Sequence, residues 1–426
     1  MNEDFIVYVW RYKLFCCYDF KSTNGSDIEI LSYGERNFDS GPDFFNAKIR
    51  IGDQLWAGNV EIHVNSSDWY RHKHQNDKAY NNVILHVVYN HDKEVEVLES
   101  VLPVLELKNY ISEIVTENYK ELTGPSKSFL SCAKSYSFTY DFEYQNWIES
   151  LFVKRLETKT DDVRNQLDIS VSHWEQVLFR SISRSFGLKL NGEAFANFSS
   201  SFDFKLVQNV SKNINSVEAL FFGQAGFLDE EIDGEYFGKL KTEYSFLKRK
   251  YSLKSVNNSQ FKFFRTRPAN FPTIRMSQLA HLYQRHPDLF SKILEVNSVR
   301  QMKKILSSGV SDFWKDHYTF KSGSKISERR LSSSFMELLI LNSVIPVRFT
   351  YFRAINNSRK IEESLELAEY LMKENNKIIS EFEKYGWRVN NAKESQALLE
   401  LNNSLCHKNL CLNCLIGKRV LERNTV

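Results

Sequence analysis

Residues 83–89 are apolar at nearly every position, and only His86 interrupts the run. A strand with one solvated face would alternate apolar and polar residues, so this pattern is typical of a central strand that is covered on both faces. Such a strand requires a sheet with further chain packed on each side. The sequence therefore predicts an α/β domain around residues 83–89.

The surrounding residues predict further strands at 28–32, 45–51, 55–64 and 104–107. Apolar and polar residues alternate in 45–51 and 55–64, which indicates two half-buried strands joined by a tight turn and paired antiparallel. Helical spacing predicts a short helix at 4–13, and Ser66 or Ser67 is expected to cap a second helix that runs to about residue 78. The crossover through this second helix makes the strand at 82–89 parallel to its neighbour.

Beyond about residue 110, strand signals are sparse and helical periodicity dominates, as in residues 147–159. A chain of 426 residues exceeds what one hydrophobic core usually spans. The expected fold class is α+β, with a mixed-sheet domain of α-β-β-β-α-β order followed by a mostly α-helical region. The domain boundaries are predicted as an α/β domain at 1–122, a Gly-, Pro- and Ser-containing linker at 123–140, and the helical region at 141–426.

Composition and targeting signals predict a cytoplasmic protein. The apolar stretch near the N-terminus spans six residues, too few for a secretory signal, and it follows two acids. The most apolar later stretch, 338–347, is interrupted by Asn342, Ser343 and Pro346, so no membrane span is expected. Six cysteines in 426 residues exclude a secreted disulfide-rich domain.

The densest group of acids and histidines lies in the N-terminal domain. Asp43 opens the strand at 45–51, and Glu61 and His63 share one face of the next strand. A hairpin joins the two strands, so both carboxylates are expected to meet. Two adjacent carboxylates repel unless a cation lies between them, and Mg²⁺ or Mn²⁺ takes such oxygen ligands. The bound ion would offset charge on a phosphate, and His63 would position or deprotonate water.

The alternative interpretation of these residues is structural. Asp43 would then only stabilise its turn, while Glu61 and His63 would form the solvated face of a half-exposed strand. His86, alone in its apolar run, is expected to be a core histidine that has a hydrogen-bond partner.

His72-Lys73-His74 suggests a second kind of metal site, the His-x-His motif of metallo-hydrolases. On a helix the two side chains point about 200° apart and cannot bind one ion, so the motif requires a loop. On the expected helix His74 and Asp77 share a face, and His72, His74 and Asp77 would border the Asp43–Glu61 site.

Pro42-Asp43 and Glu61-Ile62-His63, in this order of elements, resemble the PD-(D/E)XK nuclease fold of restriction endonucleases. The resemblance implies an Asp that opens the second strand and a Glu-x-Lys on the third. His63 stands in place of the Lys, and a neutral imidazole would serve as a base or a metal ligand where Lys supplies fixed charge. Glu106-Leu107-Lys108 also spells Glu-x-Lys and is the second choice.

Longer strings resemble an uncharacterised bacterial family, domain of unknown function 2851. They lie at 41–44, 56–63, 67–69, 72–77, 80–88, 219–226 and 265–272, and the resemblance includes the cysteines near the C-terminus. It spans nearly the whole chain and implies no established function.

A basic stretch at 239–275 contains ten Lys or Arg and one acid, with seven aromatic residues interleaved. Positive charge attracts phosphates and aromatic rings stack on unpaired bases, so nucleic acid is the expected partner, held by Arg265, Arg267 and Arg275. The alternatives are a solvated helix face followed by arginines that pair with nearby acids, or arginines that pack on the N-terminal domain and complete its site.

Three cysteines near the C-terminus, Cys406, Cys411 and Cys414, have the spacing of metal ligands. With a fourth ligand they would hold Zn²⁺ or an iron–sulfur cluster, whereas otherwise they are small apolar residues. The fourth ligand is left open among His407, Cys132, Cys16 and Cys17.

Together these features favour a metal-dependent, nuclease-like protein that acts on nucleic-acid phosphodiesters. The second hypothesis is a nucleic-acid-binding or adaptor protein without catalysis. The third is a metallo-hydrolase that uses the histidines.

Overall fold

The computed structural model describes residues 2–124, 129–134, 139–169 and 173–423. The chain forms two compact units: unit 1 comprises Met1–Tyr144, Lys384–Gly386 and Leu401–Val426, and unit 2 comprises Gln145–Glu383 and Trp387–Glu400. The C-terminal segment thus belongs to the unit of the sheet, although the sequence analysis assigned it to the helical region. The predicted linker includes 125–128 and 135–138, which lie outside the described residues.

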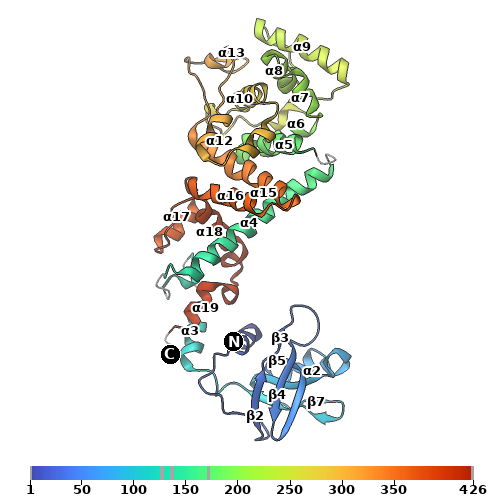
Figure 1. Cartoon of the computed structure of the whole chain (residues 1–426), viewed down its shortest axis with the longest axis vertical. Coiled ribbons are helices and arrows are strands. Elements are labelled where there is room, and N and C mark those ends of the chain that lie inside the picture. The colour runs from blue at the N-terminus through green and yellow to red at the C-terminus, as the bar shows by residue number, and fades with distance from the viewer. Residues whose placement is uncertain (1, 125–128, 135–138, 170–172, 424–426) are drawn as a thin grey trace. The chain divides into compact units, whose positions relative to one another are not determined.

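Unit 1 is built on a seven-stranded mixed sheet with the order β1-β2-β4-β5-β6-β9, in which β3 also pairs with β4 (Figure 1). The strands are β1 (Phe20–Lys21), β2 (Asp27–Ser32), β3 (Glu35–Arg36), β4 (Phe44–Ile51), β5 (Gln54–Asn65), β6 (Val83–Asn90) and β9 (Val104–Glu106). Ser22, just after β1, pairs with Leu105 of β9. The two edges of the sheet therefore meet, and the sheet is nearly closed into a barrel.

The strand pairing agrees with the sequence-based expectation. β4 and β5 are antiparallel, β5 and β6 are parallel, and β6 is buried from Val83 to Val88. Helix α1 (Glu3–Tyr12) precedes the strands, begins at the capping side chain of Asn2, and packs against β5. The α+β class is confirmed, with a mixed sheet followed by a largely helical region.

The connection from β5 to β6 differs from the predicted helix at 66–78. Helix α2 covers only Asp68–Arg71, and the 3₁₀ turns η1 (His74–Asn76) and η2 (Lys78–Tyr80) follow it. Lys73 has φ 63°, in the left-handed region, which stops the helix before His74.

The serines expected to cap that helix have another role. Ser66 Oγ and Ser67 Oγ lie 3.1 and 2.7 Å from the carboxylate oxygens of Asp92, to which they donate. Ser67 is the N-cap residue of α2, as expected, but its side chain makes no capping hydrogen bond and donates to Asp92 instead.

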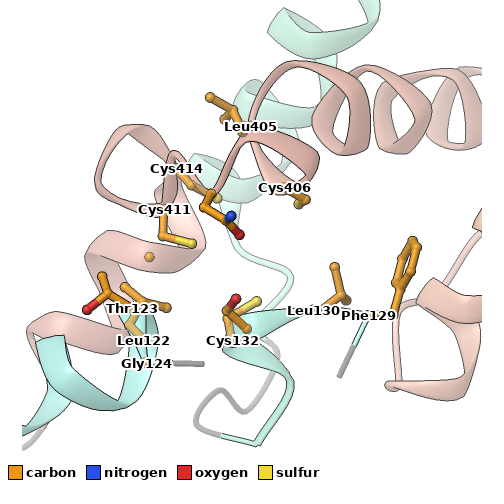
Figure 2. Close-up of a pocket in the computed structure, with 13 residues that line it drawn as sticks. Leu122, Thr123, Gly124, Phe129, Leu130, Cys132, Leu405, Cys406, Cys411 and Cys414 are labelled. Carbon is orange, nitrogen blue, oxygen red and sulfur yellow. The ribbon is translucent and has the colours of Figure 1, made fainter. Parts of the chain in front are cut away.

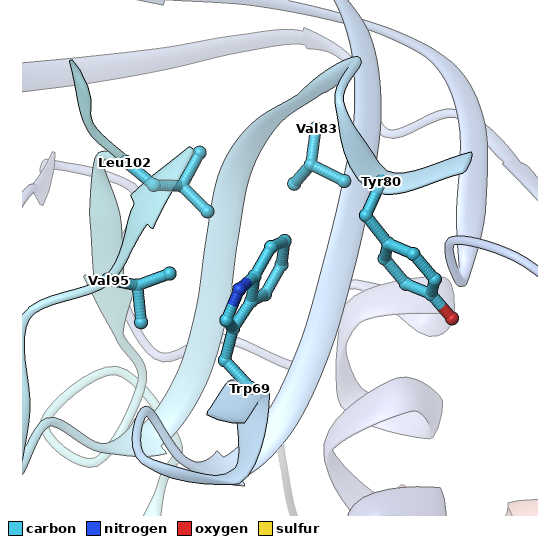
Figure 3. Close-up of a cluster of buried hydrophobic side chains, with 5 residues drawn as sticks. All are labelled: Trp69, Tyr80, Val83, Val95 and Leu102. Atoms are coloured by element: carbon cyan, nitrogen blue, oxygen red, sulfur yellow. The ribbon is translucent and has the colours of Figure 1, made fainter. Parts of the chain in front are cut away.

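An apolar cluster supports the turns between α2 and β6 (Figure 3). It consists of Trp69, Tyr80, Val83, Val95 and Leu102. Val95 and Leu102 flank the hairpin of β7 (Glu96–Val97) and β8 (Ser100–Val101). The Trp69 ring is fully buried and contacts the imidazoles of His74 and His86 at centroid distances of 5.3 and 5.4 Å.

The rest of unit 1 brings together two segments that are distant in the sequence. These are α3 (Glu113–Thr123) with η3 (Ser131–Lys134), and the C-terminal elements η8 (Cys406–Lys408), η9 (Cys411–Asn413) and α19 (Leu415–Leu421). Helices α3 and α19 pack together, and Asn118 Nδ2 donates to the carbonyls of Leu421 and Arg423 at 3.2 and 3.0 Å.

Unit 2 is largely helical. Its longer helices are α4 (Phe142–Ile169), α5 (Trp174–Phe186), α6 (Leu188–Ser200), α8 (Ile214–Gln224), α9 (Glu235–Tyr251), α10 (Pro272–Arg285), α15 (Ile345–Ala354), α16 (Ser358–Glu366) and α18 (Ala392–Ser404), the first and last of which extend into unit 1. The helix predicted at 147–159 lies within α4.

The apolar stretch at 338–347 lies in a continuous helix. Helix α14 (Ser333–Leu339) runs through the π-helical turn Ile340–Val344 into α15, and this wider turn directly precedes Pro346, which lacks an amide hydrogen. Among the described residues, Ser333–Ala354 is long and apolar enough to cross a membrane, yet 72% of its most apolar window is buried within the protein. That burial is typical of a core helix.

A carboxylic acid is fully buried in unit 2. Glu218 of α8 accepts hydrogen bonds from Ser277 Oγ at 2.6 Å, Tyr236 OH at 2.7 Å and Ser311 Oγ at 3.0 Å. Burial raises the pKa of Glu218 to about 7, although the three hydroxyl donors oppose this shift.

Substitution of the central residue of the apolar cluster should destabilise unit 1. Trp69→Ala is expected to lower the free energy of unfolding by about 3–5 kcal/mol, because it removes a fully buried indole. Hydrogen exchange of the β5 and β6 amides would report the loss. Trp56→Ala is the control, since that ring is 40% exposed on β5. Equal losses in the two variants would contradict the role of the cluster.

The stability of unit 2 should fall as the pH rises from about 4.5 to about 7. Folded Glu218 still holds a proton in this range, whereas the unfolded chain has released it. The fall should be on the order of 3 kcal/mol and should level off above pH 7. Urea denaturation at pH 5 and pH 8, followed by helical circular dichroism, measures it. Glu218→Gln should lose this pH dependence, and an unchanged dependence would refute the assignment.

Candidate functional site

Asp43 and Glu61 lie opposite each other on neighbouring strands. The Asp43 amide donates to Glu61 Oε2, and the Ile62 amide donates to Asp43 Oδ2, both at 3.0 Å. Glu61 and His63 are 5% and 0% exposed. The alternative in which they form a solvated strand face is therefore wrong, and the predicted meeting of the two acids is observed.

A bulge in β4 sets this register. Phe44 pairs with Val60 but Ala47 pairs with Gly58, so β4 carries one extra residue, and Asn46 adopts φ 58° there. Bulges redirect the side chains at the end of a strand. With Phe44 paired to Val60, the residue before it, Asp43, lies opposite Glu61.

Arg36 engages the carboxylate of Asp43. Its guanidinium donates to Asp43 Oδ1 and, at 3.0 Å, to the Asp43 carbonyl. With the Ile62 amide on Oδ2, both oxygens of Asp43 already accept hydrogen bonds. Burial raises the pKa of Asp43 although Arg36 opposes it, and burial together with Asp43 raises the pKa of Glu61 to about 9.

The second oxygen of Glu61 faces histidines. Glu61 Oε1 lies 3.2 Å from His74 Nε2 and 3.6 Å from His63 Nε2, and His63 Nε2 lies 3.1 Å from His72 Nδ1. His63, His72 and His74 each present a nitrogen, and all of these atoms lie within 4.8 Å of one another. Three imidazoles and a carboxylate thus surround one small volume.

The turn after α2 makes this convergence possible. His72 follows the last residue of α2 and His74 begins η1, with left-handed Lys73 between them. The helix that would have separated the two imidazoles is absent from this segment, so the condition for a His-x-His motif is met. His74 Nε2 is buried and forms no well-aligned hydrogen bond, but it lies 3.2 Å from Glu61 Oε1, so the two atoms face each other as possible ligands of one ion.

His86 holds His63 in place. His63 Nδ1 lies 2.8 Å from His86 Nε2 in the core, which leaves His63 Nε2 directed at the other histidines. Burial lowers the pKa of His63 to about 2 and that of His86 to about 3. His86 is a buried core histidine as expected, and it is bonded directly to a site residue.

Three further residues at the site were missed from the sequence. They are Arg36, Tyr80, whose ring stacks on His74 at a centroid distance of 3.8 Å, and Glu3, whose pKa is raised to about 7 by burial and by Asp43 and Glu61. Arg36 reaches Asp43 through β3, a two-residue strand too short to leave a signal in the sequence.

Two predicted residues have other roles. Asp77 is exposed, and its Oδ1 accepts from the Ala79 amide at 2.9 Å to cap η2, so it shares no helix face with His74. Glu106, the second choice for the Glu-x-Lys motif, accepts from the His91 amide at 2.9 Å.

The predicted nucleic-acid ligands of unit 2 differ in accessibility. Arg265 and Arg267 are exposed, and Arg265 lies beside the ring of Phe264, which is 81% exposed. Arg275 is buried, lies 3.6 Å from the centroid of the Phe335 ring, and donates to Gln278 and Asn270. The prediction for Arg275 is wrong, because its guanidinium is engaged within the core.

The C-terminal cysteines line one cavity in unit 1 (Figure 2). Cys132 lines it together with Cys406, Cys411 and Cys414. Of the other proposed fourth ligands, His407 is exposed, and the sulfurs of Cys16 and Cys17 lie 3.9 Å from each other.

Comparison with known proteins establishes the family. Residues 3–377 match the family model described as protein of unknown function, DUF2851. The chain belongs to the DUF2851 family. The match ends before the C-terminal cysteines, which the sequence analysis had included in the resemblance. No curated protein and no solved structure is significantly similar to the chain, so the PD-(D/E)XK resemblance rests on motifs alone.

Removal of the positively charged Arg36 side chain beside Asp43 and Glu61 should destabilise unit 1. Arg36→Ala is expected to lower the free energy of unfolding by about 3 kcal/mol, because Asp43 and Glu61 lose their countercharge. Asp43→Asn in the same chain should recover part of the loss. Arg50→Ala is the matched control, with an exposed partner, Glu29, and a loss below about 1 kcal/mol. Equal losses of unfolding free energy in Arg36→Ala and Arg50→Ala, measured from denaturation curves, would contradict this role of Arg36.

Proposed function

We propose that this DUF2851 protein is a metal-dependent hydrolase that binds a divalent transition-metal ion through His63, His72 and His74, with Glu61 as a further ligand. The observation that supports this is the convergence of three imidazole nitrogens within 4.8 Å of one another, beside Glu61 Oε1. Imidazole nitrogens suit zinc and its neighbours in the first transition row better than they suit Mg²⁺. His74 Nε2, which lies 3.2 Å from Glu61 Oε1, belongs to the same donor set.

The site has the features of a catalytic rather than a closed structural centre. His63 is buried but His72 is exposed, so the donor set reaches solvent on one side. Catalytic metal sites keep a coordination position for water or substrate. A metal bound there would lower the pKa of that water and polarise a phosphoryl oxygen. Asp43 is a positioning residue in this proposal, since Arg36 and the Ile62 amide occupy its oxygens.

The proposed substrates are nucleic-acid phosphodiesters. In unit 2 the exposed Arg265 and Arg267 adjoin the exposed ring of Phe264, a combination that suits phosphate and an unpaired base. Nucleic acid is therefore the first class of substrate to test.

A second candidate is the two-acid, Mg²⁺- or Mn²⁺-dependent nuclease of PD-(D/E)XK type. Asp43 opposite Glu61, and the sequence of antiparallel and then parallel pairing through β4, β5 and β6, favour it. The engaged oxygens of Asp43 and the four-residue length of α2 favour the histidine site instead.

The histidine site predicts a metal and an activity that disappear together. Elemental analysis of the purified protein should find about one zinc, manganese or iron ion per chain at this site. His72→Ala and His74→Ala should each lose this metal and lower phosphodiester cleavage by more than about 100-fold, whereas His86→Ala should cost about 10–100-fold. Gln75→Ala, an exposed neighbour on the same turn, should leave both unchanged.

Further outcomes separate the candidates. Asp43→Asn should retain the metal, because Asp43 is not a ligand in this proposal, whereas loss of metal in that variant would favour the two-acid nuclease. Nucleic-acid binding without cleavage, unaffected by a chelator, would overturn both and favour the non-catalytic hypothesis.

A further inference from the structure

The four cysteines of the cavity in unit 1 come from two segments that are far apart in the sequence. Cys132 lies in η3, and Cys406, Cys411 and Cys414 lie in the segment from η8 to the start of α19. Figure 2 shows them arranged around a cavity of about 360 Å³. Protein from both segments thus directs four thiols toward one space.

The spacing of the sulfurs indicates what that space holds. A single Zn²⁺ at about 2.3 Å from each of four thiolates requires sulfurs about 3.8 Å apart. Among the described residues, the metal-donor atoms that lie within 4.8 Å of one another in a group of three are those of His63, His72 and His74. No three of the four cysteine sulfurs therefore lie within 4.8 Å of one another. A cubane cluster binds each thiolate at a different iron and therefore suits sulfurs spread around a cavity.

Backbone amides support the same assignment. The amides of Ile416 and Gly417, at the start of α19, donate to the Cys414 sulfur. Amide donors to sulfur are a means by which proteins tune iron–sulfur clusters. A Cβ on Gly417 would lie 1.9 Å from the Cys411 carbonyl oxygen, so only glycine permits this packing.

The remaining wall of the cavity is mixed. Leu122, Phe129, Leu130 and Leu405 supply its apolar part, and Thr123, Ser131 and Asn409 its polar part. Apolar contacts and hydrogen bonds to the sulfurs both tune a bound cluster.

We infer that Cys132, Cys406, Cys411 and Cys414 bind a [4Fe–4S] cluster. The cluster joins η3 to the segment from η8 to α19 and so holds these two parts of unit 1 together. The inference is independent of the histidine site, which shares no residue with it.

The test uses the full chain, purified without oxygen or reconstituted with ferrous iron and sulfide. Inorganic sulfide is the deciding measurement, because iron at the histidine site would bring none. About four sulfides and four cluster irons per chain are expected, with visible absorption that bleaches on reduction. Zinc at these cysteines, or no sulfide after reconstitution, would overturn the assignment.

Variants identify the ligands. Cys132→Ser and Cys411→Ser should lose the sulfide, whereas Cys16→Ser and Cys17→Ser, the matched controls, should keep it. Full sulfide in Cys132→Ser would exclude Cys132 as the fourth ligand and overturn the four-cysteine site.

Alkylation of the wild-type protein gives the same answer without a substitution that could impair folding. Iodoacetamide should label Cys16 and Cys17 but spare the other four cysteines until the cluster is removed. Equal labelling of all six cysteines before removal would overturn the inference.

Discussion

The parallel pairing of β5 with β6 is the constraint on which the histidine site depends. It places Glu61 level with His86 and His63 level with Val88, so the side chains that form the site project from one face of two central strands. Gly58 permits this approach, since a Cβ there would lie 2.4 Å from Ile84 Cγ2 and 2.7 Å from the Asn82 carbonyl oxygen. A shift by one residue in this register would turn Glu61 and His63 to the other face.

This pairing also explains why the site is costly to the fold. Two carboxylates and several imidazoles lie in the interior, where an apolar set of residues would be more stable. Arg36 and a backbone amide satisfy Asp43, but His86 Nδ1 has no hydrogen-bond partner, and His74 Nε2 faces Glu61 Oε1 at 3.2 Å without a well-aligned hydrogen bond. Groups of this kind, with pKa values displaced by burial and by one another, are concentrated at functional sites.

The parts of the site that follow from strand periodicity could be predicted from the sequence. Alternation along β4 and β5 brought Asp43 and Glu61 together, and the apolar run identified β6. The length of the helix between the strands could not be predicted, because it ends before left-handed Lys73 and the side chains of Ser66 and Ser67 bond to Asp92, about 25 residues further along the chain. Local rules extended this helix to about residue 78 and so separated His72 from His74.

The burial of Arg275 in unit 2 could not be predicted from composition either. Arg275 lies in a basic stretch whose composition is typical of an exposed surface. Its guanidinium nevertheless stacks on the ring of Phe335, sixty residues later in the chain. Cys132 was one of four open choices for a fourth cysteine ligand, because its proximity to Cys406 depends on contacts between α3 and α19. Contacts between residues so far apart in the sequence produce no periodic pattern in it.

The return of the C-terminus to unit 1 has a consequence for biosynthesis. Asn118 of α3 donates to carbonyls of Leu421 and Arg423, so its partners leave the ribosome about 300 residues after it does. Nascent chains generally fold from the N-terminus as whole domains emerge, but this unit lacks α19 until residues 415–421 have been synthesised. The helical unit is encoded between the two parts of the sheet unit, so its residues are all synthesised before α19, the helix that packs against α3, becomes available to the sheet unit.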